Sequence, residues 1–307
     1  TELSFGTSSL GSMPDTYGYE VPEQRAQETL KRFFQGPVNM LDTSRNYAMG
    51  ESEKRIGIAI KENGGWPEKF VLSTKIDRNM DTLVLDKKRT RESIEESLKA
   101  LNVDSVDVLF LHDPEYVKDI NDVTKKDGAL DELFKIKEEG LAKAVGLAMG
   151  RIDIMFPILR KWDFDVIINH NRYTLLNREA DEMYSYAHSK NISIFNAAPY
   201  AGGVLAKGPS NFKKITYQDA TEEKLAPAIE IEKVCKKYNV EMGAAALQFS
   251  MKDKRITSTI CGVTSVQSIE KNLAWAKTDI PEEFWNEVLK LPYSTKDPES
   301  ERTYTPG

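Results

Sequence analysis

The chain has 307 residues, a formal net charge of −6, and 40% hydrophobic against 29% charged residues. This composition excludes collagen, low-complexity disorder and a coiled coil as the main structure. The excess of acidic over basic residues argues against a nucleic-acid-binding protein, which needs a basic face. The longest uncharged stretch, 191–206, is too short and too polar to span a bilayer. We therefore expect a globular protein without a nucleic-acid or membrane partner.

The cysteines and histidines carry no sign of a disulfide framework or a metal site. Cys235 and Cys261 are too few for a framework, and we expect buried free thiols in a reducing cytoplasm. The three histidines are far apart in the sequence, and neither H-E-x-x-H nor paired-cysteine spacing occurs. No metal site is predicted.

Short apolar runs alternate with helical patterns along the chain. Strands are predicted at Glu2–Gly6, Val38–Asp42, Phe70–Lys75, Val106–His112, Lys143–Ala148, Asp165–His170, Ile192–Ala197 and Ile256–Gly262. Most of these runs are continuously apolar, which is typical of parallel strands buried on both faces. Amphipathic helices are predicted at Glu53–Ile60, Arg91–Leu101, Leu130–Glu138, Asn177–His188, Lys224–Tyr238 and Ser265–Ala274.

The strand-then-helix order predicts an α/β protein, and specifically a single (β/α)₈ TIM barrel over residues 1–292. The strand ends at 42, 75 and 112 are spaced by about one βα unit each. The alternative, an open doubly wound sheet, would need a G-x-G-x-x-G sequence after the first strand, and none is present.

Two segments fall outside the repeating pattern. The long loop 199–221 is rich in Gly, Pro, Ser and Asn, and we expect a functional lid because it follows a strand end, where barrel active sites form. Residues 293–307 form a polar C-terminal tail, either a flexible end or a flap over the barrel mouth.

Four residues of complementary chemistry lie at the ends of three consecutive strands. Asp42, Lys75 and His112 each close a predicted strand, and Tyr47 follows Asp42 by five residues. In a barrel they converge at the catalytic face. Taken singly, each residue has an ordinary structural explanation as a cap, a surface lysine or a structural histidine. Together they predict interconversion of a carbonyl and an alcohol.

The predicted chemistry centres on Tyr47, because a phenol is a poor acid or base at neutral pH. The Lys75 ammonium would lower its pKa, and Asp42 would hold that lysine charged and oriented. His112 would hydrogen-bond the substrate oxygen or Tyr47. Tyr47 would then act as general acid/base, with the electrons carried as hydride on a nicotinamide cofactor.

Three segments resemble the catalytic blocks of the aldo-keto reductases: Leu41–Tyr47 (LDTSRNY), Ser73–Lys75 (STK) and Leu111–Pro114 (LHDP). The resemblance runs in order from about Gly6 to Asn272. It implies a (β/α)₈ barrel that binds NAD(P)H without a Rossmann motif. It also implies Tyr47 as general acid/base, tuned by Asp42, Lys75 and His112.

Shorter motifs resemble the aldose 1-dehydrogenase and pyridoxal dehydrogenase branch: Asn171–Leu176, His112–Pro114 and Ala198–Tyr200. The nicotinamide positions depart from the usual family pattern. Ala148-Met149 stands where Ser-Asn is usual, and His170 stands where Gln is usual. His170 is either a partner of the nicotinamide carboxamide or an inert structural histidine.

The segment from Ile260 to Asn272 resembles the one that holds the adenosine phosphate. By this resemblance, the cofactor-binding residues are Gly6, Thr7, Asp42, His170, Tyr200, Gly202, Ile260, Gly262, Thr264, Ser265, Ser268 and Asn272. Members that prefer NADP usually place Arg or Lys here, whereas this chain has Ser265 and Ser268, with Lys271 nearby. We expect NAD, with NADP as the alternative.

The substrate is expected to contact Tyr17, Tyr47, His112 and Tyr200, at the ends of predicted strands or in the loops after them. The leading prediction is an NAD(P)-dependent oxidoreductase acting on a small carbonyl compound, alcohol or sugar. Two alternatives stay open: a non-enzymatic nicotinamide-binding regulatory subunit, as some family barrels are, and a lyase that uses Lys75 as a Schiff base. The physiological substrate, the direction of reaction and the oligomeric state are not predicted.

Overall fold

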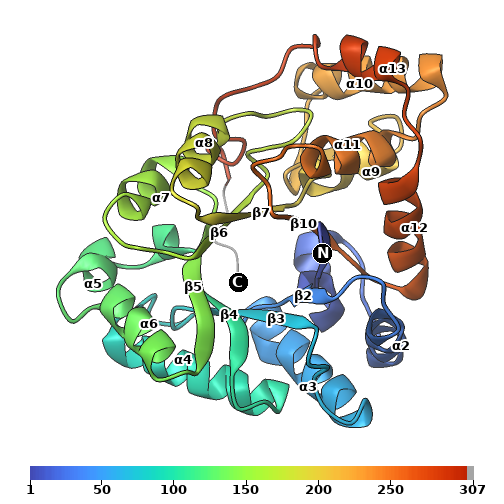
Figure 1. Ribbon diagram of the computed structural model, residues 1–307. Helices are drawn as coiled ribbons and strands as arrows, with labels where there is room; N and C mark the ends of the chain where they lie inside the picture. Colours follow the sequence, from blue (N-terminus) through green and yellow to red (C-terminus); the bar gives the residue numbers. More distant parts are fainter. Residues whose placement is uncertain (303–307) are drawn as a thin grey trace.

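The computed structural model describes residues 1–302, which contain a closed eight-stranded barrel (Figure 1). The barrel strands are β1 (Leu3–Gly6), β2 (Met40–Asp42), β3 (Val71–Ile76), β4 (Val106–His112), β5 (Ala142–Met149), β6 (Val166–His170), β7 (Ser193–Ala197) and β10 (Ser258–Gly262). Their order around the barrel is β1-β10-β7-β6-β5-β4-β3-β2, and all neighbours are parallel. The predicted (β/α)₈ barrel is confirmed.

Helices surround the strands on the outside (Figure 1). They are α1 (Pro14–Tyr17), α2 (Glu23–Phe34), α3 (Glu51–Glu62), α4 (Lys87–Leu101), α5 (Ile120–Thr124), α6 (Ala129–Glu138), α7 (Ile152–Leu159), α8 (Asp181–Ser189), α9 (Val204–Lys207), α10 (Glu222–Tyr238), α11 (Met242–Met251), α12 (Val266–Lys277) and α13 (Glu282–Val288). Short 3₁₀ turns are η1 (Ser8–Gly11), η2 (Tyr47–Gly50), η3 (Pro114–Tyr116) and η4 (Ala201–Gly203). None of the helices in residues 1–302 combines the length and the apolar character that crossing a membrane requires.

Side-chain contacts fix several helix starts that the sequence pattern predicted only approximately. The carboxylate of Asp86 caps α4 by accepting a hydrogen bond from the Arg89 N–H at 2.8 Å. By contrast, α8 begins at Asp181 and not at the predicted Asn177. Asn177 forms bridges with Thr174 and Ser294 instead, because its backbone is paired outside the helix.

The core has two layers, as the continuously apolar strands predict. Inward-facing side chains fill the barrel: Met40, Val108, Phe110, Ala148, Val166, Ile168, Phe195 and Ile260. A larger apolar layer lies between the strands and the helices. Since both faces of the strands are apolar, the polar residues concentrate where the strands end.

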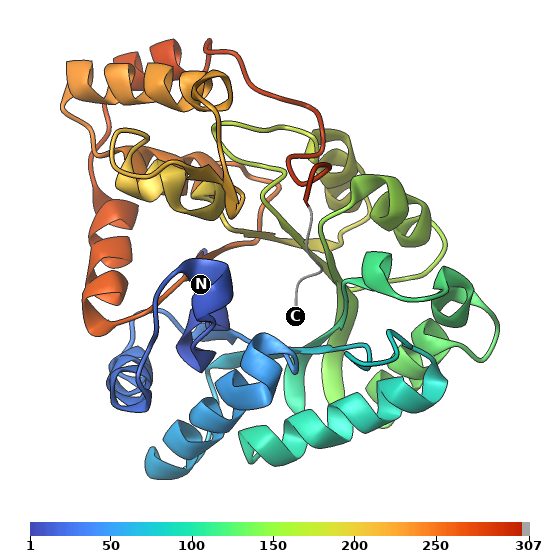
Figure 2. The ribbon, with the colours of Figure 1, turned by 180° about the vertical axis from the view of Figure 1, so that it is seen from behind.

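The segment after α13 passes across the side of the barrel on which the strands end, as Figure 2 shows from behind. The Arg178 N–H donates to the Ser294 carbonyl at 2.8 Å, and the Thr216 hydroxyl donates to the Pro298 carbonyl at 3.1 Å. Thr216 belongs to the long loop 199–221, which folds into η4, α9 and a hairpin of β8 (Lys214–Ile215) and β9 (Gln218–Asp219). Residues 303–307 of the predicted tail lie outside the described residues.

Candidate active site

A cavity of about 300 Å³ opens at the carboxyl ends of the strands. Its lining includes these predicted site residues: Gly6, Tyr17, Asp42, Tyr47, Lys75, His112, His170, Tyr200, Gly202, Ile260, Gly262 and Thr264. Thr7, Ser265, Ser268 and Asn272 do not line it. The fold thus brings together residues that are up to 258 positions apart in the chain.

Lys75 is the centre of the polar contacts in the cavity. Its Nζ donates to Asp42 Oδ2 at 2.7 Å, to the Thr43 carbonyl at 2.6 Å and to the Tyr47 hydroxyl at 3.1 Å. The side chain is only 2% exposed. The three hydrogen bonds use all the donors of the ammonium, which is therefore held in one position.

The backbone of η2 turns sharply to bring Tyr47 back over the barrel mouth. Ala48 and Met49 have positive φ angles of 51° and 55°, and Gly50 follows at 92°. The left-handed backbone at Gly50 favours glycine, because residues with a Cβ rarely adopt this conformation. The turn thus delivers the phenol to Lys75.

Burial raises the pKa of Tyr47 well above its ordinary value of 10, and the negative charge of Asp42 adds to the effect. The prediction that Lys75 would lower this pKa is wrong for this structure. The reason is that desolvation of the phenol outweighs the effect of the neighbouring ammonium, and the negative charge of Asp42, which pairs with that ammonium, raises the pKa further. Tyr47 therefore carries its proton at neutral pH.

The imidazole of His112 lies next to Tyr47, with ring centroids 5.9 Å apart and ring planes at 83°. On its other side, Nδ1 is 2.6 Å from Asp77 Oδ1. Nε2 is 3.6 Å from Asp113 Oδ1. Burial by itself lowers the pKa of His112, but the carboxylates of Asp113 and Asp77 outweigh it and raise the pKa above its usual 6.5.

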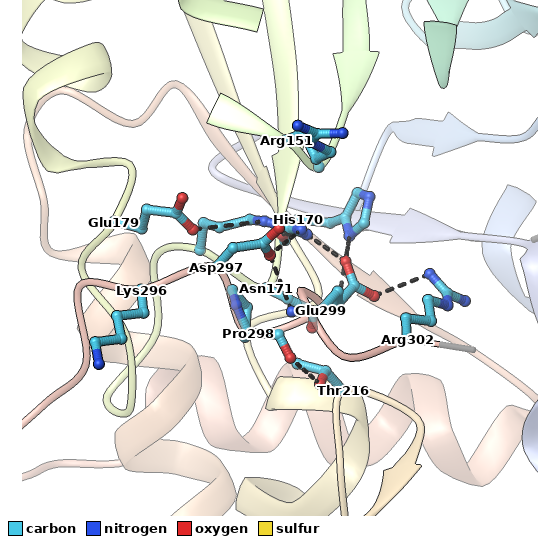
Figure 3. Close-up of polar contacts among 12 residues, drawn as sticks. Arg151, His170, Asn171, Glu179, Thr216, Lys296, Asp297, Pro298, Glu299 and Arg302 are labelled. Atoms are coloured by element: carbon cyan, nitrogen blue, oxygen red, sulfur yellow. Dashed lines mark hydrogen bonds and ion pairs between the residues drawn. The ribbon is translucent and has the colours of Figure 1, made fainter. Parts of the chain in front are cut away.

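The C-terminal segment supplies part of the cavity wall (Figure 3). The Glu299 carboxylate accepts a short hydrogen bond from Nη1 of Arg172, and it lies 3.0 Å from Nη1 of Arg302 and 3.6 Å from Nδ1 of His170. Asp297 pairs with the same arginine, Arg172. Since Glu299 is buried, its charge depends on the two arginines, Arg172 and Arg302.

The cavity lining at Gly262 and Thr264 has features suited to the phosphates of a nicotinamide dinucleotide. No atom lies within 4 Å of the position that a Cβ would take at Gly262, so the backbone there is open to a ligand. Gly262 precedes α12, whose start has N–H groups and a positive dipole end suited to phosphate. Here Gly262 and Thr264 would hold the phosphates, and Gly6, Ile260 and His170 line the same cavity.

The remaining residues predicted to bind cofactor make contacts within the protein. Ser265 and Ser268 form a reciprocal capping box at the start of α12. The Tyr200 hydroxyl donates a short hydrogen bond to Oδ1 of Asn272. The Thr7 hydroxyl donates to the Asp42 carbonyl at 3.0 Å. Thr7, Ser265, Ser268 and Asn272 therefore lie behind the cavity wall, whereas the Tyr200 side chain that Asn272 holds is part of the lining.

Several residues that line the cavity are not predicted from the sequence: Asp77, Arg78, Asp113, Tyr217 and Arg302. Asp77 and Arg78 follow Lys75 at the exit of β3, and Asp113 follows His112, so the strand-end rule could have found them. Arg302 and Tyr217 gave no comparable signal, because they reach the site only through tertiary folding. Among residues 1–302, no group of three or more His, Cys, Asp or Glu is placed to hold a metal ion.

The family model described as "Aldo/keto reductase family" matches residues 2–291. The chain belongs to this family. The resemblance found in the sequence is therefore confirmed, and the chain is an NAD(P)-dependent oxidoreductase by family.

Relatives of known activity match over most of the chain. L-galactose dehydrogenase of Arabidopsis thaliana is 30% identical, covering 89% of this chain and 83% of the relative. D-threo-aldose 1-dehydrogenase of a Pseudomonas species is 27% identical, covering 94% and 93%. Pyridoxal 4-dehydrogenase of Microbacterium luteolum is 24% identical, covering 93% and 92%. A probable voltage-gated potassium channel subunit beta of Arabidopsis thaliana also matches, at 26% identity and 88% and 87% coverage.

Among solved structures, an aldo-keto reductase of Bacillus halodurans in its holo form has a TM-score of 0.78 at 21% identity. The match covers 98% of this chain and 95% of that one. At this identity the similarity concerns the fold, which is the same (β/α)₈ barrel.

Proposed function

We propose that this aldo-keto reductase interconverts the hydroxyl or hemiacetal of a small sugar-like substrate with the corresponding carbonyl, with Tyr47 as general acid/base. The observation that carries the proposal is the position of Lys75, which bridges Asp42 and the Tyr47 hydroxyl inside the cavity. This arrangement puts a proton donor next to the place where a substrate oxygen can enter.

The residues of the site would divide the work as follows. The phenol of Tyr47 donates its proton to the carbonyl oxygen in reduction, and Lys75 stabilises the phenolate left behind. His112 hydrogen-bonds the same oxygen and orients it. When bound, the nicotinamide supplies the hydride to carbon in reduction and accepts it in oxidation.

Two observations support a sugar or polyol as the substrate class. Relatives that match over most of their length are named L-galactose dehydrogenase and D-threo-aldose 1-dehydrogenase. The cavity also combines aromatic rings with several charged groups, which is suited to a hydroxylated compound. Tyr17 and Tyr200 remain the proposed aromatic substrate contacts.

We further propose NAD as the cofactor. Between Ile260 and Asn272 the only cationic side chain is Lys271, whose ammonium lies 4.5 Å from the centre of the Trp275 ring. This leaves no guanidinium on the segment for a 2′-phosphate. The two cysteines are buried free thiols, in keeping with a proposed cytoplasmic location.

The test is the absorbance of reduced nicotinamide with a panel of aldoses and simple aldehydes, using NAD and NADP in parallel. We expect turnover with at least one aldose and a higher kcat/KM with NAD. A clear preference for NADP would contradict the cofactor assignment. Cofactor binding without turnover of any substrate would favour the regulatory subunit, the alternative that the similarity to a channel subunit keeps open.

The geometry does not favour the Schiff-base lyase. A Schiff base needs a neutral amine with a free lone pair. The Nζ of Lys75 instead donates to three acceptors and pairs with Asp42. We therefore propose that Lys75 acts through its positive charge and not as a nucleophile.

A further inference from the structure

Asp77 lies directly behind the imidazole of His112. Its Oδ1 is 2.6 Å from Nδ1 of His112. Its Oδ2 accepts a short hydrogen bond from the Ser44 hydroxyl and another, at 2.9 Å, from the Asn46 N–H. The Asp77 side chain is 1% exposed. Both carboxylate oxygens are therefore engaged, and the carboxylate is fixed in place.

The ionisation of Asp77 decides which nitrogen of His112 carries a proton. Burial alone raises the pKa of Asp77, but the positive charge and hydrogen bond of His112 and the Ser44 hydroxyl reverse this, and the pKa is lowered overall. An ionised carboxylate can only accept hydrogen bonds, so Nδ1 of His112 must donate. Nε2 is then the nitrogen that gains or loses a proton.

This matters because the site needs a proton acceptor when it oxidises an alcohol. The buried phenol of Tyr47 keeps its proton, since its pKa is raised well above 10. A neutral phenol accepts a proton from the substrate only when its own proton moves on to a third group. His112 packs against the Tyr47 ring in the same cavity.

We propose that Asp77 is a positioning residue that holds His112 as the Nδ1–H tautomer, so that Nε2 receives the proton released in alcohol oxidation and returns it in reduction. The proposal rests on the function proposed above. In oxidation the substrate O–H bond breaks and the proton passes to the Tyr47 oxygen. The original phenol proton moves to Nε2, while the hydride leaves carbon for the oxidised nicotinamide.

Several charged or titratable groups surround His112: Lys75 and Asp77 on β3 or directly after it, Tyr47 on η2 and Asp113 after β4. Asp113 interacts in turn with Glu115 on η3. Burial, together with the charge of Asp113, raises the pKa of Glu115 to about 7. Because Glu115 titrates in the same range as a histidine, the pH dependence of activity cannot by itself identify His112. The test must observe the imidazole directly.

The experiment is ¹⁵N NMR of the full chain labelled at histidine, recorded across pH without cofactor. The chain has three histidines, so His170→Gln and His188→Gln variants assign the signals. In the wild type we expect neutral His112 with its proton on Nδ1. In Asp77→Asn we expect the pKa of His112 to fall by about one unit or more, because an opposite charge in contact is lost.

The matched control is Asp107→Asn. Asp107 also lies on a barrel strand and accepts a backbone hydrogen bond, from the Leu72 N–H at 2.8 Å, but it is paired with Lys143 away from the cavity. We expect removal of the Asp107 charge to leave the pKa and the tautomer of His112 unchanged. Asp77→Glu, which keeps the charge, should restore part of the lost pKa shift.

The second measurement is the pH profile of kcat for oxidation. We expect its acid limb to move in Asp77→Asn by the same amount as the pKa of His112. Neutral His112 with its proton on Nε2 would overturn the proposal from the wild-type spectrum alone, whether or not the variant folds. An unchanged pKa in Asp77→Asn, or an unmoved acid limb, would also overturn it. If no substrate turns over, the proposed function fails, while the NMR result still decides the tautomer.

Discussion

At the scale of single residues, the site depends on how two buried charges compensate each other. Lys75 and Asp42 are 2% and 5% exposed, and they are 2.7 Å apart. Either charge left alone in this environment would cost several kcal/mol. Desolvation, together with the negative charge of Asp42, keeps the phenol of Tyr47 protonated while it receives a hydrogen bond from the lysine.

Replacement of Tyr47 by Phe tests the assignment of the general acid/base. We expect kcat to fall by about 10²–10⁴-fold, because only the proton donor is removed. Cofactor affinity, measured by fluorescence titration, should stay nearly unchanged. The control is Tyr184→Phe, which removes another buried phenol, one bonded to Asn196 away from the cavity, and should keep its turnover. Turnover of Tyr47→Phe near the wild-type rate would contradict the assignment.

At the scale of elements, the C-terminal segment belongs to the wall of the site. Glu299 and Asp297 both contact Arg172, which follows β6 and is 1% exposed. The same segment contacts the long loop through Thr216 and Pro298. Within the loop, Gly202 has a φ of 74°, and a Cβ there would lie 2.7 Å from the Tyr217 N–H nitrogen. The loop and the segment are thus packed as one layer beside the cavity.

Replacement of Glu299 by Gln tests whether its contact with Arg172 holds the C-terminal segment in place. Removing the buried charge leaves Arg172 incompletely paired, and we expect the free energy of unfolding to fall by about 3 kcal/mol. Limited proteolysis should cut faster after residue 292. Glu301→Gln is the control, because Glu301 is on the same segment but is exposed and pairs with Lys224 at the surface. If both variants behave like the wild type, the segment is not held by the Glu299 contacts.

At the scale of the whole molecule, closure of the barrel and packing of the helices against it bury some ionisable side chains. The free-energy cost of burying them depends on pH. Glu53 on α3 reaches inward to Thr74 of β3, whose hydroxyl donates to Oε1 at 2.6 Å. Arg45 is 3.6 Å from the other oxygen. Burial nevertheless raises the pKa of Glu53 to about 7. The folded state therefore binds this proton more tightly than the unfolded state, whose glutamate has a pKa near 4.5.

The sign of the pH effect follows from this difference. The contribution of protonated Glu53 is fully present below about pH 4.5 and is lost as the pH rises to about 7. We expect Glu53→Gln to be more stable than the wild type at pH 8, by at most about 3 kcal/mol, and similar to it at pH 4.5. Urea unfolding at both pH values measures this. Glu62→Gln, exposed on the same helix, should show no such difference. An equal difference in stability between Glu53→Gln and the wild type at the two pH values would contradict the raised pKa of Glu53.

The barrel and most of the catalytic residues could be predicted from the sequence. Continuous apolar runs mark strands buried on both faces, and the bounds predicted for β4, Val106–His112, are those observed. Asp42, Lys75 and His112 stand at the ends of such runs, so the parallel order of the strands alone brings them to one side. The start of α8 was not predictable, because the pairing of Asn177 with Ser294 involves residues far apart in the sequence.

The sequence by itself determined the order of the strands, the family and the identity of the four residues of complementary chemistry. These properties follow from local hydrophobic patterning and from which residue ends each strand. Only the tertiary structure decided the protonation of Tyr47, the pairing of Asp77 with His112 and the pairing of Glu299 with Arg172. The physical reason is that burial and electrostatic pairing are set by neighbours in space, and those neighbours come from distant parts of the chain.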